Sequence, residues 1–168
     1  DLEVIATSLQ SHGSGRLADG RLRTLQRAVA TFGFHLATLD LRQNSIVHEE
    51  VVAELLAKAG VTARYRELDE QRRVAILTQE LRLPRPLLSP FLAYSAITTD
   101  EIAILRVGAR IRATFGTDAL ANYVISKCEA MSDLLEVGIL LREVGLLTYA
   151  PQPSCQVNIV PLFETIAD

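Results

Sequence analysis

The chain has the length, composition and charge of a folded globular domain. It has 168 residues and a mass of 18.5 kDa, with 49% hydrophobic and 22% charged residues, close to the average for folded proteins. The net charge of −3 gives no basic excess for nucleic-acid backbones, and no apolar stretch reaches the ~18 residues of a membrane span. We therefore expect a cytoplasmic protein that binds neither nucleic acid nor membrane.

The first part of the chain predicts two helices followed by a strand. Residues 2–9 have helical character, and residues 18–31 carry apolar side chains at spacings of three and four. Gly33 marks the end of this second helix and the start of the first strand. The segment of residues 32–43 is an apolar run that ends in the charged residue Arg42. Such a run is typical of a strand buried in a parallel sheet, and His35 within it is typical of a hydrogen-bonded core histidine.

The remainder predicts four helices and two more strands. Helices are expected over residues 44–59, 68–83, 98–115 and 132–145, because each begins at a capping residue and ends at glycine or proline. Strands are expected over residues 121–126 and 157–164. Cys128 and Cys155 lack the spacing of zinc ligands and are typical of free thiols.

This order of elements predicts an α/β fold that is predominantly helical. Parallel strands joined by helices fit either an open doubly wound sheet or a barrel. About three parallel strands and several long helices would leave bare sheet edges, which a complete barrel abolishes. The chain also lacks an initiator methionine and stops just after a strand. We therefore expect residues 1–168 to be a single segment of a longer protein, forming part of a (β/α)8 TIM-type barrel.

Arg42 is the first candidate site residue. It lies in a polar run with Gln43 where the first strand meets a helix, and ligands of parallel folds bind at the carboxyl ends of strands. A guanidinium matches phosphate or carboxylate, and the helix that follows offers free N–H groups. His48, one turn into that helix, could face the same corner. The alternative is a solvated arginine, or one paired with Asp40.

Glu164 is the second candidate. It follows three apolar residues at the end of the last strand, and a carboxylate there suits Mg²⁺ or Mn²⁺, which bind hard oxygen ligands. The alternative is a helix cap or a surface ion pair. Ser126 and Lys127 end the middle strand with less specific chemistry, and Ser132 with Asp133 is best explained as a helix cap.

Residues 39–45 (Leu-Asp-Leu-Arg-Gln-Asn-Ser), with His48 following, resemble the L-D-[IL]-R-Q-x-S…H stretch of phosphoenolpyruvate carboxylases. Further matches follow in the family's order across essentially the whole chain. They are Leu17–Gly20, Phe32–Phe34, Tyr65–Arg66, Arg85–Leu87, Tyr123–Ser126, Ser132–Leu135 and Val160–Glu164.

The resemblance implies that this chain is an internal segment of a cytoplasmic, homotetrameric lyase built around an eight-stranded barrel. Such enzymes convert phosphoenolpyruvate and bicarbonate to oxaloacetate and phosphate, using Mg²⁺ or Mn²⁺ and no biotin. By motif, Arg42 corresponds to an arginine that binds the substrate phosphate and Glu164 to one of two acidic metal ligands, with Gln43 and His48 as further substrate-binding candidates.

The family's second metal ligand, catalytic histidine loop and glycine-rich loop have no counterpart in this chain, so we expect the segment alone to be inactive. Two other functions remain open from the sequence. One is a non-catalytic α/β module for ligand binding or assembly, and the other is a different barrel lyase acting on phosphoenolpyruvate or pyruvate.

Overall fold

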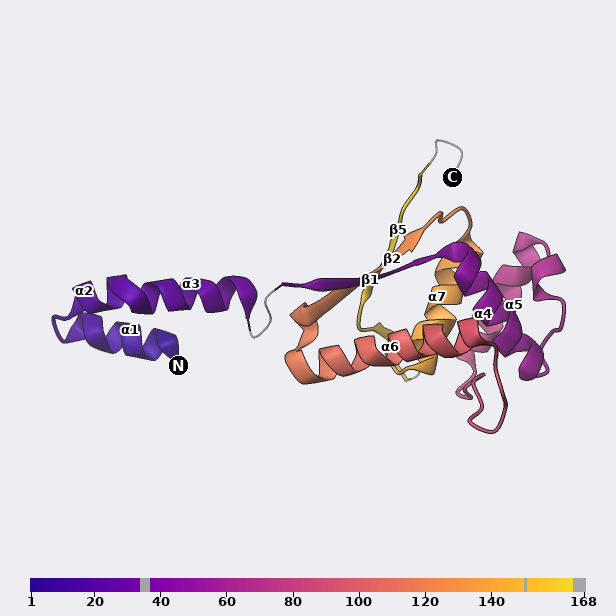
Figure 1. Cartoon of the computed structure of the whole chain (residues 1–168), viewed down its shortest axis with the longest axis horizontal. Coiled ribbons are helices and arrows are strands. Elements are labelled where there is room, and N and C mark those ends of the chain that lie inside the picture. Colours follow the sequence, from indigo (N-terminus) through magenta and orange to yellow (C-terminus); the bar gives the residue numbers. More distant parts are fainter. Residues whose placement is uncertain (34–36, 150, 165–168) are drawn as a thin grey trace. The chain divides into compact units, whose positions relative to one another are not determined.

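The computed structural model describes residues 1–33, 37–149 and 151–164, which form two compact units, residues 1–38 and 39–168. Figure 1 shows the elements of each unit in sequence colours. His35, predicted to lie in a strand, falls outside the described residues. Within the described residues, no helix has the length and apolar character needed to cross a bilayer.

The first unit is helical. Its elements are α1 (Leu2–Ser11), α2 (Gly15–Leu17), η1 (Ala18–Leu22) and α3 (Arg23–Phe32). The helix predicted over residues 18–31 is confirmed, but η1 is a π-helical turn interrupted at Gly20, where ψ is −126°. The amide of Gln26 donates to the carbonyl of Leu2 at 3.3 Å and so ties α3 to α1. Gly33 ends α3 with a φ of 58°, a conformation that favours glycine.

The second unit contains the remaining helices, and their positions agree with the predictions. They are α4 (Ser45–Lys58), η2 (Tyr65–Glu67), α5 (Glu70–Arg82), α6 (Ala96–Phe115), η3 (Thr117–Ala119) and α7 (Met131–Glu143). Asn44 and Asp69 cap α4 and α5, because their side chains accept from the N–H groups of Ile46 and Arg72.

Two predicted helix starts were wrong by one to three residues. Helix α6 begins before the predicted cap at Thr98, because the Ser95 hydroxyl already accepts from the N–H of Thr98. At α7 the hydroxyl and N–H of Ser132 donate to the Glu70 carboxylate, so Ser132 does not cap the helix. Asp133 does so instead by accepting from the N–H of Ala130.

The three predicted strands form one parallel sheet in the order β1-β2-β5. They are β1 (Leu39–Asn44), β2 (Leu120–Ser126) and β5 (Asn158–Pro161). Strand β1 starts at Leu39 rather than near residue 32, where α3 still continues and Gly33 then ends the helix with a positive φ. A short antiparallel hairpin, β3 (Leu147–Thr148) with β4 (Ser154–Cys155), was not predicted, since two-residue strands leave no periodic pattern. Cys128 and Cys155 are free thiols, as expected.

The two faces of the sheet have different surroundings. On one face Tyr123 and Ile125 of β2 are buried in a core shared with α4, α6 and α7. Gly108 of α6 allows the closest approach to this face: a Cβ atom there would lie 3.0 Å from the side chain of Leu41 and 3.2 Å from that of Leu120. We call this the covered face.

The opposite face, which we call the open face, carries side chains that are exposed or half-buried. Strand alternation places alternate residues of the three strands there: Asp40, Arg42 and Asn44 of β1, Asn122, Val124 and Ser126 of β2, and Asn158 and Val160 of β5. The fold is therefore α/β with a parallel sheet, helices on one face and a mixture of polar and half-buried apolar side chains on the other.

Candidate functional site

The parallel register brings the carboxyl ends of β1, β2 and β5 to one edge of the sheet. Asn44 pairs with Ser126, and Ile125 pairs with Pro161. Just beyond the strands, the segments that follow β2 and β5 are joined by a backbone hydrogen bond, which the N–H of Cys128 donates to the carbonyl of Leu162 at 3.2 Å. This is the edge at which parallel α/β folds bind ligands.

Arg42 lies on the open face two residues before the end of β1, level with Val124 and Val160. Its side chain is exposed, and the structure records no hydrogen bond or ion pair for it among residues 1–33, 37–149 and 151–164. The predicted alternative, pairing with Asp40, is not seen, because the Asp40 carboxylate accepts from the amide of Asn122 at 2.9 Å. The guanidinium is thus available to a ligand above the sheet.

A row of polar side chains crosses the open face beneath Arg42. Asn122 donates to Asp40, and Asn158 donates to Asn122 at 3.0 Å, so one residue from each strand takes part. The register places these three residues at one level of the sheet. Hydrogen bonding within the row satisfies these polar groups and fixes their side chains at the level of the sheet next to Arg42.

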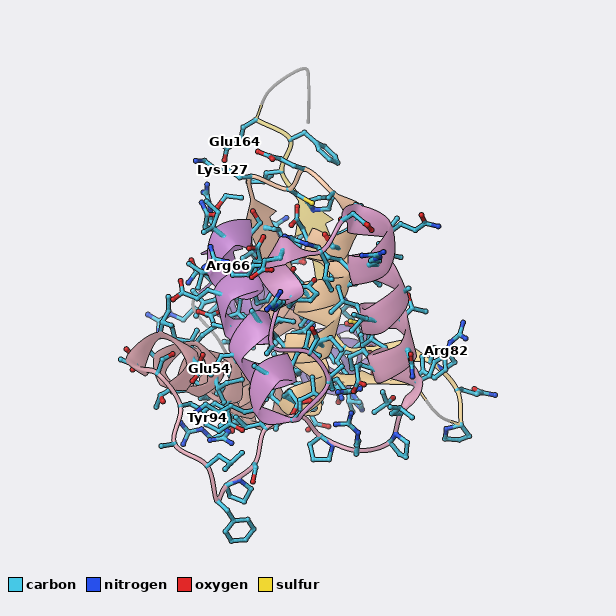
Figure 2. The ribbon with its side chains drawn as sticks, turned by 90° about the vertical axis from the view of Figure 1, so that its right-hand side faces the viewer. Glu54, Arg66, Arg82, Tyr94, Lys127 and Glu164 are labelled. Carbon is cyan, nitrogen blue, oxygen red and sulfur yellow. The ribbon has the colours of Figure 1, made fainter. Side chains whose placement is uncertain are left out.

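Glu164 lies three residues beyond the end of β5 and is exposed. Figure 2 shows it at the same end of the unit as Lys127, which follows β2. Lys127 has a φ of 54°, the one positive φ recorded for a non-glycine residue in the described chain. Arg42 therefore lies near the carboxyl end of one outer strand, β1, and Glu164 follows the carboxyl end of the other, β5.

Gln43 and His48 lie on the other side of the sheet from Arg42. Gln43 is half-buried, and its side-chain amide donates to the Glu101 carboxylate at 3.0 Å. His48 is fully buried, and its Nε2 lies 2.8 Å from the hydroxyl of Tyr123. Neither side chain can reach a ligand above the open face without leaving these contacts, so their role as substrate-binding residues stays a prediction.

The contacts of Gln43 and His48 belong to one buried network of four residues. The Tyr123 hydroxyl donates to Glu101 at 3.1 Å, so Glu101 accepts from Tyr123 with one oxygen and from Gln43 with the other. Burial and the charge of Glu101 raise the pKa of Tyr123, so the hydroxyl keeps its proton. That proton points to Glu101, so the hydroxyl oxygen accepts from the ring N–H of His48.

Burial lowers the pKa of His48 to about 4, so the ring is neutral at pH 7. With its one proton on Nε2, the ring leaves Nδ1 as an acceptor, and Nδ1 is buried without a hydrogen-bond partner in the described part of the chain. A neutral, enclosed ring of this kind suits a structural role better than proton transfer at the open face.

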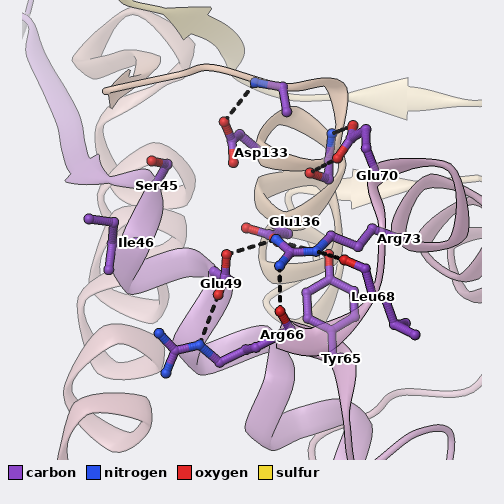
Figure 3. Close-up of polar contacts among 12 residues, drawn as sticks. Ser45, Ile46, Glu49, Tyr65, Arg66, Leu68, Glu70, Arg73, Asp133 and Glu136 are labelled. Carbon is purple, nitrogen blue, oxygen red and sulfur yellow. Dashed lines mark hydrogen bonds and ion pairs between the residues drawn. The ribbon is translucent and has the colours of Figure 1, made fainter.

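A second polar cluster joins α4, α5 and α7 and was not predicted (Figure 3). The Arg73 guanidinium donates to Glu49 at 2.7 Å, and Arg66 donates to the other Glu49 oxygen at 2.8 Å. Behind them Tyr65 donates to the buried Glu136 at 2.8 Å, and burial raises the pKa of Glu136 to about 8.

A cavity of about 260 Å³ next to this cluster is lined by both signs of charge, including Glu49, Arg73 and Lys127. Two of its carboxylates are already held, since Glu70 accepts from Ser132 and Asp133 accepts from backbone N–H groups. We therefore interpret the cluster as packing between helices rather than as a ligand site.

A signal for the buried network was present in the sequence. The buried residues of α6 follow a stripe at spacings of three and four, and Glu101 lies on it between Thr98 and Leu105. An acidic residue on an apolar stripe must find buried partners, which the structure supplies from β1 and β2. The pattern alone could not name those partners, because they are 58 and 22 residues away in the chain.

Comparisons with known proteins identify the family. The family model described as phosphoenolpyruvate carboxylase matches residues 1–168. The chain is 54% identical to the phosphoenolpyruvate carboxylase of Nocardia farcinica, 51% to that of Azorhizobium caulinodans and 54% to that of Aromatoleum aromaticum, in each case over the whole of this chain.

The chain belongs to the phosphoenolpyruvate carboxylase family. It spans 18% of the length of the curated relatives that it matches. The expected resemblance is therefore confirmed. Among the described residues, no group of three or more His, Cys, Asp or Glu side chains is placed to hold a metal ion.

Burial of His48 predicts a specific dependence of stability on pH. The folded-state pKa of about 4 lies below the ordinary value of 6.5, so between these pH values the unfolded chain binds more protons. The contribution of the neutral ring to the free energy of unfolding is complete above pH 6.5. As the pH falls toward 4 the free energy of unfolding decreases, by up to about 1.4 kcal/mol per pH unit.

Urea unfolding of the wild-type chain and of His48→Gln, at several pH values between 4 and 8, measures this effect. Glutamine keeps an N–H donor for Tyr123 but does not titrate. We expect the difference in free energy of unfolding between the two chains to be constant above pH 6.5 and to shift against the wild type below it. A difference that stays flat across the whole range would contradict the neutral, buried ring.

Proposed function

We propose that this chain is an internal segment of a phosphoenolpyruvate carboxylase, a lyase that forms oxaloacetate and phosphate from phosphoenolpyruvate and bicarbonate. The observation that carries the proposal is the match of the whole chain to the family, with relatives about half identical to it. A non-catalytic module or a different barrel lyase has no comparable support.

We propose further that the sheet continues into a closed (β/α)8 barrel whose interior is the open face. Three observations support this extension. The strands are parallel, helices cover one face, and the other face bears a hydrogen-bonded polar row beside the half-buried branched side chains of Val124 and Val160. The whole enzyme would be a cytoplasmic homotetramer, as expected from its family.

In this proposal Arg42 binds the phosphate of phosphoenolpyruvate. A guanidinium presents two parallel N–H donors to phosphate oxygens. Its permanent positive charge stabilises the negative charge of the phosphoryl group while that group is transferred to bicarbonate. Holding the donor phosphoryl group in line with bicarbonate lowers the barrier by orientation, and the fixed charge stabilises the transition state. The side chain of Arg42 is exposed and has no recorded partner in the described part of the chain, which suits this role.

Glu164 would be one ligand of Mg²⁺ or Mn²⁺. Its donor chemistry fits these ions, which take one or two carboxylates and keep several waters. The described chain brings no further carboxylate cluster to the site, so a second protein ligand would come from the rest of the enzyme. When bound, the ion supplies positive charge for the enolate of pyruvate. Nothing in the proposed chemistry requires biotin.

The isolated 168-residue chain should form no oxaloacetate, since one arginine and one carboxylate do not complete a site. A coupled assay with phosphoenolpyruvate, bicarbonate and Mg²⁺ measures this, with a full-length family member as the positive control. Bicarbonate-dependent oxaloacetate formation by the purified chain would show that the site is complete within it.

In the full-length enzyme, Arg42→Ala should raise KM for phosphoenolpyruvate by about tenfold or more and also lower kcat, because a charge-assisted bidentate contact is lost. Arg42→Lys should recover part of the loss, since it restores charge without the planar fork. Arg110→Ala, which removes an exposed arginine of α6, is the matched control and should leave both constants unchanged. Equal kinetics for Arg42→Ala and the control would remove Arg42 from the site.

Glu164→Ala should mainly weaken the use of metal. We expect the Mn²⁺ concentration for half-maximal activity to rise on the order of tenfold, the effect of losing one charged ligand. Glu67→Ala removes an exposed carboxylate of η2 and serves as the control. Wild-type metal dependence in the Glu164 variant would be incompatible with its role as a ligand.

A further inference from the structure

The buried network of Gln43, Glu101, Tyr123 and His48 takes no part in the chemistry proposed above, yet it ends beside Arg42. It connects β1, α6, β2 and α4 through side chains alone. We propose that Glu101 and Tyr123 are positioning residues, which hold the carboxyl end of β1 through Gln43 and so orient Arg42 toward the substrate phosphate. The inference rests on the proposed function of Arg42.

Gln43 is held at both ends of its side-chain amide. Its oxygen accepts from the N–H of Asn44 at 2.9 Å, and its nitrogen donates to Glu101 at 3.0 Å. Its backbone carbonyl also accepts from the hydroxyl of Ser126 at 3.3 Å. Both backbone groups belong to the peptide unit between Gln43 and Asn44, so the chain is constrained directly after Gln43, one residue beyond Arg42.

The position of β1 explains why such support is needed. Among the described strands β1 is at the edge of the sheet, so β2 is its one neighbour by backbone hydrogen bonding. Arg42 and Gln43 are adjacent and point to opposite faces. An anchor on the covered face therefore limits rotation of the strand end without occupying space on the open face where the ligand would bind.

With these protonation states, hydrogen-bond donation in the network converges on Glu101 from both sides. Neutral His48 donates to Tyr123, Tyr123 donates to Glu101, and the Glu101 carboxylate accepts from Gln43 with its second oxygen. A carboxylate is the side chain that accepts at both ends. Glu101 is 4% exposed and Tyr123 is 1% exposed, so water does not compete for these bonds.

The chain contains a matched contact that does not reach Arg42. Tyr65 is also 1% exposed and donates to a buried carboxylate, that of Glu136, at 2.8 Å. Tyr65→Phe and Tyr123→Phe remove the same hydroxyl from equally buried rings. A general loss of stability would follow from either change, whereas a loss of Arg42 orientation would follow from Tyr123→Phe alone.

The first experiment compares these two variants in the full-length enzyme. We expect both to lower the melting temperature, while KM for phosphoenolpyruvate rises about fivefold or more in Tyr123→Phe and stays within about twofold of wild type in Tyr65→Phe, since small misplacement of a binding group is costly. Equal KM values in the two folded variants would overturn the inference.

A second experiment reverses the polarity of the Gln43 contact. Gln43→Glu alone sets two carboxylates against each other and should raise KM about tenfold or more. In the double variant Gln43→Glu/Glu101→Gln, the introduced amide donates to the introduced carboxylate, which still accepts from the N–H of Asn44. The amide oxygen introduced at position 101 still accepts from the hydroxyl of Tyr123. We expect this exchange to restore KM to within about threefold of wild type.

Gln43→Ala completes the set, because it breaks the contact without adding charge and should also raise KM. If the double variant is no better than Gln43→Glu, or if Gln43→Ala binds phosphoenolpyruvate normally, the positioning role is wrong while carboxylase activity stands. If the wild-type full-length protein forms no oxaloacetate, the proposed function itself fails.

Discussion

Parallel pairing of β1 with β2 and of β2 with β5 is the constraint on which the rest of the structure depends. The pairing sends all three carboxyl ends to one edge, and it puts residues from distant parts of the chain at fixed levels of the sheet. Arg42 comes 122 residues before Glu164 in the sequence, yet both belong to that edge region. The proposal that this arginine and this carboxylate share a site depends on the parallel register.

The two faces of the sheet differ in burial and in polarity. The covered face provides stability, through a core in which Tyr123 and Ile125 pack against three helices. The open face is the one to which we assign the chemistry, and polar side chains there are exposed or bonded to one another. The buried network connects the faces, since Gln43 and Arg42 share one strand end and point in opposite directions.

The sequence predicted the helices and strands of the second unit well, because its apolar spacing and its caps at Asn44 and Asp69 act locally. It predicted less well where tertiary contacts decide. Ser132 looked like a helix cap and is bound to Glu70 of another helix. The strand expected from residue 32 begins at Leu39, since Phe32 still belongs to helix α3, and an apolar run by itself does not fix where a helix ends and a strand begins.

For the candidate site residues too, local sequence signals were informative and tertiary contacts could not be predicted. Arg42 and Glu164 became candidates as charged residues that end apolar runs, a signal that depends only on neighbours in the chain, and their roles stay predictions. The face on which Gln43 and His48 lie could not be predicted, because helix and strand geometry decide it together. Glu101 and Tyr123 were not among the candidates, because their hydrogen bonds join residues 22 to 75 positions apart.

The most direct test of the shared edge is a crystal structure of the full-length enzyme with Mn²⁺ and an unreactive phosphoenolpyruvate analogue. The account predicts that the Arg42 guanidinium contacts the phosphate above the open face and that the Glu164 carboxylate binds the ion in the same chamber. A structure in which either side chain points away from the analogue, or in which the analogue lies against the helices of the covered face, would contradict it.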